Sequence, residues 1–266
     1  MSDKNLLLLG IAAIIATMVL SYVLFPGLGR FVPVNENSDA LNPANQRASA
    51  GDVLTTQKKE IIKETPDYSE NVSYPEIVNM QDADAREKTN KAIEKFVLNH
   101  IAKFEKQILS EERAGDFQDY LQIQYLVMFL SESLVSISFS GSEDFGGAHP
   151  SSYLMTFNYD ISTDREIKLS DIFKQGTDYP GIISNICREK LSAQFGDDEA
   201  LKSWVEEGTK PEADSFENFG LTGNSLVVFF NPYEVGPYAM GIQTVEITFD
   251  EIKQYLNAGG ALEGLI

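Results

Sequence analysis

Histidines are the scarcest side chains here that could do acid–base or metal chemistry, since the 266 residues include only His100 and His149. His149 lies in a glycine-rich run, 145–150, just after Glu143 and Asp144. It could bind a metal ion or contact a partner, but a zinc site needs three or four converging ligands. The sequence offers no second cluster of ligands. We therefore expect a turn that the glycines permit and His149 caps, with no metal and no other cofactor. His100 is expected at the rim of a helix.

A second candidate site is the proline-bounded segment 231–241, which contains Tyr233, Glu234, Pro237 and Tyr238. Two aromatic rings and a carboxylate could bind a polypeptide or a glycan. Equally, the rings could close the end of the core while Pro237 fixes the turn. Both interpretations stay open, and these four residues and His149 are the candidate binding residues.

Neither the single cysteine nor any known catalytic motif in the sequence predicts an enzyme. Cys187 falls on the apolar side of a predicted helix, where we expect a buried structural thiol, because no base can be placed beside it. The chain has no Gly-x-Ser-x-Gly sequence, phosphate-binding loop, dinucleotide fingerprint or Cys-x-x-Cys pair. We assign no catalytic residue.

Hydrophobic periodicity predicts the elements that position these side chains. Apolar residues such as Ile93, Val97 and Phe104 recur every three or four positions and predict a helix over about 83–111. Shorter helical segments are expected over 169–173, 179–195, 197–207 and 250–256, the last capped by Asp250. Strands are expected over 60–65, 72–77, 120–130, 134–140, 153–159, 216–221, 226–230 and 242–249, with Pro75 marking an edge strand. This order predicts an α+β fold in which helices pack on antiparallel sheets.

The amino-terminal residues predict a membrane anchor. Leu6 to Phe25 carries no charge, and as a helix it would span about 30 Å of hydrocarbon. A cleaved signal peptide is the alternative, but the run exceeds the usual apolar length of about 7–15 residues. We expect a cytoplasmic stub at 1–5, a transmembrane helix at 6–25 and a disordered tether at 26–57. The bulk of the chain would then be extracytoplasmic on a single-pass membrane protein.

Charge narrows the choice of partner. The chain has 40 Asp and Glu against 21 Lys and Arg, for a net charge of −19 at pH 7. Such a surface repels nucleic acid, so no nucleic-acid binding is expected. It favours encounter with a basic partner, although the charge could equally serve solubility alone. The lone cysteine excludes an internal disulfide, so an ordinary apolar core must stabilise the domain.

Two parts of the sequence resemble known families. The first comprises 145–150, 156–160 and 167–173, and the second is 229–241. In this order and spacing they resemble the extracellular domain of the RsiV anti-sigma factors and the amino-terminal, non-catalytic region of the PdaC peptidoglycan deacetylases. These are paired bacterial domain families of unknown function, numbers 4163 and 3298, and the resemblance covers about 60–257.

The resemblance implies a PdaC-like, helix-bearing subdomain at 58–160 and an RsiV-like subdomain at 161–257, followed by a flexible tail at 258–266. It also implies a cell-surface recognition domain, since RsiV binds lysozyme with this region. No direct sigma-factor binding is expected, because only Met1 to Asn5 would reach the cytoplasm. No enzyme is expected either, because the deacetylase catalytic domain is absent.

The leading hypothesis is therefore a membrane-anchored extracytoplasmic domain that binds a polypeptide or a cell-wall component. A basic protein of the lysozyme kind and peptidoglycan are the expected ligand classes. The alternatives are a cell-wall-acting hydrolase or deacetylase, and a purely architectural envelope protein.

Overall fold

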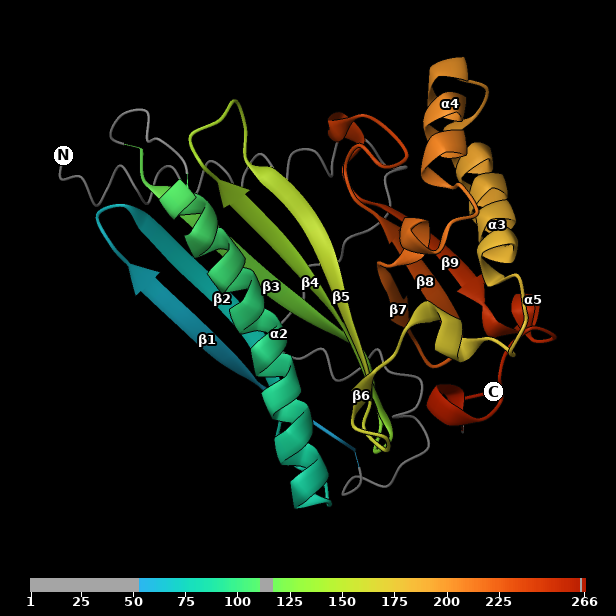
Figure 1. The fold of residues 1–266 in the computed structure, drawn as a ribbon, viewed down its shortest axis with the longest axis horizontal. Helices are drawn as coiled ribbons and strands as arrows, with labels where there is room; N and C mark the ends of the chain where they lie inside the picture. Colours follow the sequence, from blue (N-terminus) through green and yellow to red (C-terminus); the bar gives the residue numbers. More distant parts are fainter. Residues whose placement is uncertain (1–52, 111–116, 264) are drawn as a thin grey trace. The chain divides into compact units, whose positions relative to one another are not determined.

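The computed structural model describes residues 53–110, 117–263 and 265–266, which form helices packed on two β-sheets (Figure 1). In spatial order, the first sheet contains β1 (Thr56–Glu64), β2 (Tyr68–Ile77), β3 (Asp119–Leu130), β4 (Leu134–Asp144), β5 (Ser151–Asp160) and β6 (Arg165–Glu166). The second contains β7 (Phe219–Leu221), β8 (Ser225–Phe230) and β9 (Gln243–Thr248). The helices are α2 (Ala83–Ser110), α3 (Tyr179–Phe195), α4 (Glu199–Gly208) and α5 (Phe249–Ile252). The expected mixed α+β class is confirmed.

One strand pair departs from the antiparallel expectation. β2 and β3 run parallel over Tyr68↔Asp119 to Val72↔Ile123, while all other strand pairs in the described residues are antiparallel. The reason is the connection between them. A parallel pair needs a long crossover, and α2 supplies it between these two strands.

The expectation that Pro75 marks an edge strand is wrong, because β2 lies between β1 and β3. However, the pairing of β2 with β3 ends at Val72, so at Pro75 the strand pairs only with β1. A proline, which has no N–H to donate, is tolerated at a position with one paired side.

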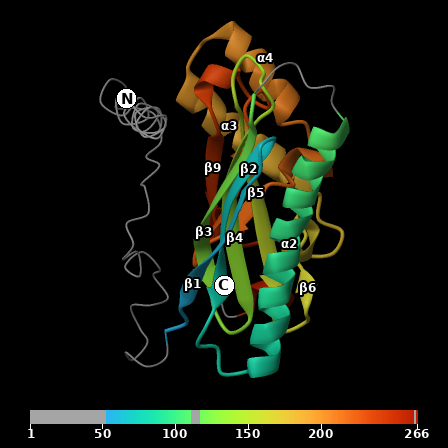
Figure 2. The same cartoon turned by 90° about the vertical axis from the view of Figure 1, so that its left-hand side faces the viewer.

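Helix α2 covers one face of the first sheet (Figure 2). It buries an apolar stripe consisting of Ile93, Val97, Ile101, Phe104 and Ile108. Phe96 lies beside the stripe, with its ring 5.3 Å from those of both Phe139 and Phe157. The helix begins where Asp82 Oδ1 accepts the N–H groups of Asp84 and Ala85, each at 3.0 Å. The predicted long helix is thus confirmed as far as Ser110, the last residue described before the gap at 111–116.

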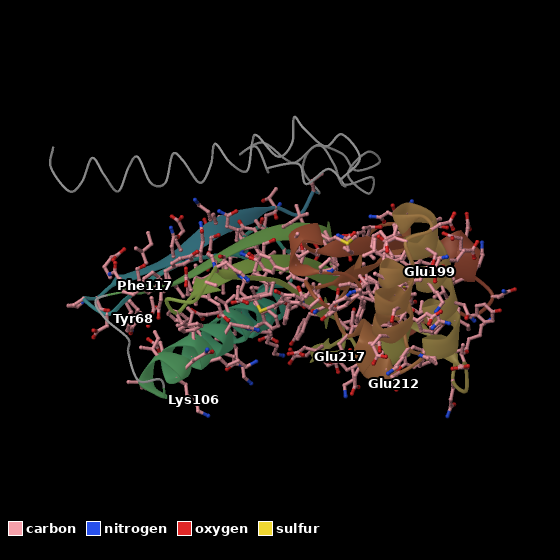
Figure 3. The ribbon with its side chains drawn as sticks, turned by 90° about the horizontal axis from the view of Figure 1, so that it is seen from above. Tyr68, Lys106, Phe117, Glu199, Glu212 and Glu217 are labelled. Atoms are coloured by element: carbon pink, nitrogen blue, oxygen red, sulfur yellow. The ribbon has the colours of Figure 1, made fainter. Side chains whose placement is uncertain are left out.

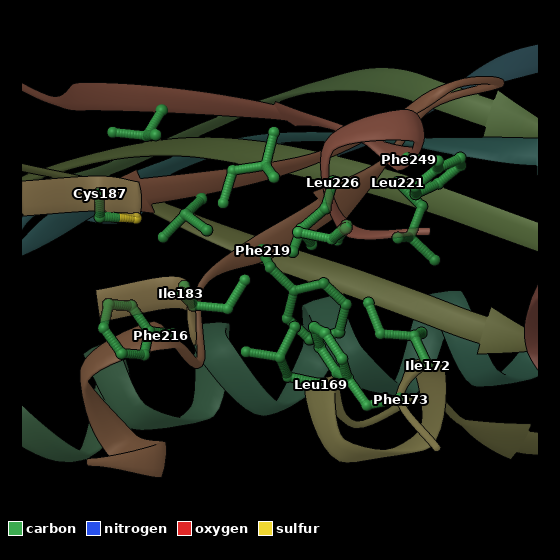
Figure 4. Close-up of a cluster of buried hydrophobic side chains, with 14 of the residues drawn as sticks. Leu169, Ile172, Phe173, Ile183, Cys187, Phe216, Phe219, Leu221, Leu226 and Phe249 are labelled. Carbon is green, nitrogen blue, oxygen red and sulfur yellow. The ribbon is translucent and has the colours of Figure 1, made fainter. Parts of the chain in front are cut away.

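The second sheet shares an apolar core with α3, α4 and the 3-10 helices around them (Figure 4). α3 contributes Ile183, Cys187 and Leu191, which are four residues apart and fully buried. The predicted hairpin turn between β7 and β8 is confirmed, since Thr222 N donates to Ser225 O at 2.9 Å.

The predicted cap of the last helix is wrong by two residues. Thr248, not Asp250, caps α5, because Thr248 Oγ1 accepts from Glu251 N while Glu251 Oε2 accepts from Thr248 N. This reciprocal pair forms a capping box. Asp250 instead lies within the first turn, where its charge favours the helix dipole.

Two buried side chains join the sheets on the face of the first sheet opposite α2. Ser136 Oγ, on β4, donates to Asn158 Oδ1 on β5 at 2.7 Å and accepts from Leu221 N at 2.9 Å. Asn158 Nδ2 donates to Phe219 O at 2.6 Å. Backbone groups on the side of β7 away from β8 are therefore satisfied by side chains.

Both ends of the described region from residue 53 to 266 differ from expectation. Order begins before Lys58, because Asn79 bonds the backbone of Val53 and Thr55, and β1 starts at Thr56. At the carboxyl end, the expected flexible tail includes a 3-10 helix, η6 (Gly260–Leu262), and Leu262 is fully buried. The conformational entropy lost when this segment becomes ordered is offset by burial of its apolar side chains in the core of the second sheet, which we call the second core.

No helix within residues 53–110, 117–263 and 265–266 is long and apolar enough to cross a bilayer. The predicted stub, the predicted span from Leu6 to Phe25 and the tether up to residue 52 lie outside the described residues. They stay predictions.

Candidate functional site

Four rings from three separate segments come together in what we call the aromatic row. It consists of Trp204 on α4, Tyr233 and Tyr238 in the segment 231–241, and His149 in the β4–β5 loop. Successive ring centroids are 6.5 Å apart for Trp204–Tyr233, 5.8 Å for Tyr233–Tyr238 and 4.1 Å for Tyr238–His149. The last pair is stacked, with 25° between the ring planes.

One end of the row is held by hydrogen bonds to a single carbonyl. Tyr238 Oη donates to Pro150 O at 2.7 Å, and His149 Nδ1 lies 2.9 Å from the same oxygen. Because a carbonyl only accepts, Nδ1 must carry the hydrogen. His149 therefore forms a hydrogen bond to the backbone of its own turn, as the structural interpretation expects. The same turn places its ring against that of Tyr238.

Segment 231–241 is fixed to the first sheet by Asn231. Its Oδ1 accepts Leu154 N at 2.7 Å and its Nδ2 donates to Leu154 O at 3.2 Å. The amide thus takes the place of a neighbouring strand at the open edge of β5. The next residues fold back, since Tyr233 N donates to Gly236 O at 3.0 Å, and the fully buried Val235 anchors the turn in the core.

Tyr233 stands out in this turn for its backbone and its exposure. Its φ of +74° is a left-handed conformation that non-glycine residues rarely adopt and that disfavours a bulky side chain. Its side chain is nevertheless 54% exposed, and that of Trp204 is 36% exposed. Tyr233 thus combines an unfavourable backbone conformation with an exposed aromatic ring.

Helix α4, which carries Trp204, lies close to the segment 231–241 at its carboxyl end. Asp198 caps the helix by accepting from Ala200 N at 2.9 Å, and Val205 is buried in the second core. At the other end, a Cβ on Gly208 would lie 2.0 Å from Glu234 O. Only glycine lets the end of α4 approach segment 231–241 this closely.

Helix α4, which carries Trp204, and the residues after it up to 217 contain more acidic than basic side chains. Two lysines in this stretch form ion pairs, Lys202 with Glu199 and Lys210 with Glu207. Glu199, Glu206 and Glu207 on α4, and Glu212 and Glu217 after it, are exposed; Figure 3 labels three of them. Glu234 turns back so that its Oε2 accepts Asn231 N at 2.7 Å. Desolvation raises the pKa of the Glu234 carboxyl, while this hydrogen bond acts in the opposite direction.

The predicted site residues divide into two groups. The structure brings Tyr233, Tyr238 and His149 into ring contact, whereas Glu234 and Pro237 have local roles. Glu234 bonds within its own turn, and Pro237 precedes the 3-10 helix η5 (Tyr238–Met240). Whether these residues bind a ligand stays a prediction.

Sequence reasoning missed Trp204. A signal was available, because it is the only tryptophan and lies in a short helix rich in charged residues. The sequence could not predict that Trp204 lies beside Tyr233, because the two residues are far apart in the chain.

The other reactive groups lie where they were expected. Cys187 is fully buried, and burial raises the pKa of its thiol to about 12, which suits a structural role. His100 lies on the rim of α2 with its ring 4.7 Å from that of Phe96. Among the described residues, no three His, Cys, Asp or Glu side chains gather closely enough to hold a metal ion.

Two family models match the two halves of this fold. Residues 61–152 match the model described as deacetylase PdaC, and residues 170–250 match a protein of unknown function, DUF3298. The expected similarity to PdaC and to family 3298 is therefore confirmed. The likeness to RsiV stays a prediction.

Curated relatives show similar partial matches. The chain is 26% identical over 199 residues to the peptidoglycan-N-acetylmuramic acid deacetylase PdaC of Bacillus subtilis, a match covering 74% of this chain and 40% of that protein. It is 31% identical over 99 residues to the esterase Rv3036c of Mycobacterium tuberculosis, covering 37% of this chain and 42% of the esterase. The immunogenic protein MPT64 of the same species is 27% identical over 111 residues, covering 42% of this chain and 47% of MPT64. The matches thus span less than half the length of these relatives.

Solved structures share the fold. A DUF3298-family protein from Bacteroides fragilis aligns with a TM-score of 0.58 at 19% identity, covering 81% of this chain and 98% of that one. A DUF3298-family protein from Pseudomonas aeruginosa PAO1 aligns with a TM-score of 0.56 at 17% identity, covering 78% and 96%. The arrangement of helices and sheets is thus one found in DUF3298 proteins.

Proposed function

We propose that this chain is an extracytoplasmic recognition protein of the bacterial envelope, and that it binds a basic polypeptide through the aromatic row. The observation that carries the proposal is the gathering of four rings from three segments, with Trp204 and Tyr233 exposed. Tryptophan and tyrosine are the side chains most often found at the energetic centres of protein interfaces.

The envelope location is supported from two directions. The matched deacetylase acts, by its name, on peptidoglycan, which lies outside the cytoplasmic membrane. The uncharged stretch from Leu6 to Phe25 would anchor the chain there.

Charge favours a basic polypeptide over other ligands. Exposed glutamates on α4 share the helix with Trp204, and the whole chain carries −19. Opposite charge accelerates encounter and excludes acidic competitors. Peptidoglycan is the other ligand class to be compared in the same experiment.

Binding of the full-length chain, held in detergent, to lysozyme and to purified peptidoglycan would test the proposal. We expect lysozyme to bind, and the Trp204→Ala, Tyr233→Ala double variant to weaken binding by more than tenfold, since each hot-spot ring contributes about 2 kcal/mol. Leu109→Ala, which alters another exposed apolar side chain, is the control. Equal binding by the double variant and the control would refute the role of the row, and binding to peptidoglycan alone would overturn the choice of ligand.

A hydrolase is the second candidate, favoured by the similarity to an esterase. It predicts turnover of acetyl esters or of acetylated wall fragments that His149→Ala abolishes. The recognition proposal predicts no turnover by the wild-type chain, so one assay with both proteins separates the two.

A further inference from the structure

A pocket of about 320 Å³ with a mixed polar and apolar lining lies between the second half of α2, the end of β4 and the beginning of β5. Its lining consists of His100, Lys103, Phe104 and Gln107 from α2, Glu143 from β4, and Tyr153 and Met155 from β5. It shares no residue with the aromatic row. Its volume falls at the lower end of the range of about 300–1,000 Å³ for small-ligand sites.

The pocket depends on a glycine opposite a tyrosine. Gly141 on β4 pairs with Tyr153 on β5, and a Cβ on Gly141 would clash with the Tyr153 ring at 2.2 Å. The ring therefore lies flat across β4, where its hydroxyl donates to Glu143. Phe104, which lines the pocket, packs on Phe145 with ring centroids 5.3 Å apart and 38° between the ring planes. Tyr153 and Glu143 are thus held in place by packing.

The polar lining offers both donors and acceptors. His100 Nδ1 lies 2.9 Å from Phe96 O, so Nδ1 carries the hydrogen, and burial lowers the pKa of the imidazole. Nε2 of the neutral ring is then an acceptor. The Glu143 carboxyl is a second acceptor, and burial raises its pKa. Lys103 supplies an ammonium donor, and Met155 and Phe104 supply apolar surface.

This combination selects an uncharged ligand rich in hydroxyl groups. An ion of either sign would meet one attractive and one repulsive group, Lys103 and Glu143, so the lining favours neither net charge. A hydroxyl can donate to His100 or Glu143 and accept from Lys103. The C–H face of a sugar ring can pack on Met155.

We propose that this pocket, formed by α2, β4 and β5, binds a single neutral monosaccharide unit, independently of the aromatic row. It is a second site for a different class of ligand and would stand even if the row bound nothing.

NMR titration of the full-length chain with glucose and with N-acetylglucosamine would test this, with glycine as a zwitterionic control probe. We expect millimolar binding, with chemical-shift changes centred on residues 100–107, 141–143 and 153–155. Glu143→Ala and Lys103→Ala should each weaken binding about tenfold or more, corresponding to about 1.4 kcal/mol. Trp204→Ala should leave it unchanged.

Tyr153→Phe guards against misfolding, because it keeps the ring over Gly141 and removes only the hydroxyl. A native-like spectrum with weakened sugar binding supports the proposal. Absence of shifts with both sugars, shifts centred elsewhere, equal binding of glycine, or undiminished binding by folded Glu143 and Lys103 variants would each overturn it.

Discussion

Glu70 is the most unusual carboxyl in the described residues. It lies on β2 at 1% exposure, and its Oε1 has no hydrogen-bond partner. The charged groups that face it are Lys63 on β1 and Glu105 on α2, and Glu105 also accepts Lys63 Nζ at 2.5 Å and Tyr68 Oη at 3.1 Å. Burial, followed by the negative charge of Glu105, raises the pKa of Glu70. A protonated Glu70 can donate to Glu105, whereas an ionised one leaves two carboxylates together.

This arrangement gives stability a definite pH dependence. Below the unfolded-state pKa of about 4.5, Glu70 is neutral in both states and carries no penalty. As the pH rises toward and through the higher folded-state pKa, ionisation is favoured in the unfolded chain and stability is lost. Glu70→Gln, whose amide can still donate to Glu105, should therefore be more stable than wild type at pH values above the folded-state pKa of Glu70, and it should flatten the dependence of stability on pH.

Urea unfolding from pH 4.5 to 8 would measure the effect, with the exposed Glu60→Gln as the control. A constant difference between Glu70→Gln and wild type at every pH would contradict the assignment.

At the scale of elements, the end of helix α4 and the segment 231–241 form one unit. Asn231 bonds the segment to β5, and the close approach at Gly208 brings α4 against it. The two exposed rings of the row, Trp204 and Tyr233, are positioned by this contact. Changing the helix end should therefore change the site.

Gly208→Ala tests this contact, because the clash and the helix propensity predict changes of opposite sign in the free energy of unfolding. Helix propensity alone predicts stabilisation of up to about 1 kcal/mol. The new methyl group would instead meet the backbone oxygen of Glu234, so we expect destabilisation of about 1–3 kcal/mol, altered Trp204 fluorescence and weaker binding at the row.

Gly147→Ala is the matched control, because its nearest contact would be His149 O at 3.9 Å. Denaturation followed by the fluorescence of Trp204, the only tryptophan, provides the measurement. A Gly208→Ala protein as stable as wild type would mean that the contact is easily relieved.

At the scale of the whole described region, two apolar clusters meet across the Ser136–Asn158 network. Asn158 links β5 to β7, and Ser136 links β4 to β7. These are bonds from buried side chains to backbone groups, so removing one partner leaves the other buried and unsatisfied.

Asn158→Ala should lower the free energy of unfolding by about 1–3 kcal/mol. It should also separate the two halves, so that Trp204 fluorescence, which reports on the second core, changes at lower denaturant than far-UV circular dichroism.

Ser138→Ala is the control, since Ser138 is buried on the same strand without a side-chain hydrogen bond recorded within the described residues. Identical midpoints for the Asn158 and Ser138 variants would show that the network does not couple the sheets.

Local patterns in the sequence determined much of this fold. Apolar spacing located α2 and α3, β-rich runs located the meander β3–β5, and the turn at 222–224 located the β7–β8 hairpin. These features depend on residues within about ten positions of one another, and such information survives in a single sequence. The sequence also singled out Tyr233, Tyr238 and His149 as candidate binding residues, in two separate segments.

Only the tertiary structure decided the rest. It placed Pro75 inside the sheet, buried Leu262, moved the α5 cap to Thr248 and added Trp204 to the row. Except for the cap, these outcomes depend on contacts between residues far apart in the chain. Hydrophobic periodicity in the sequence predicts whether a side chain is buried or exposed. The residues that it contacts are decided by how whole helices and strands pack together.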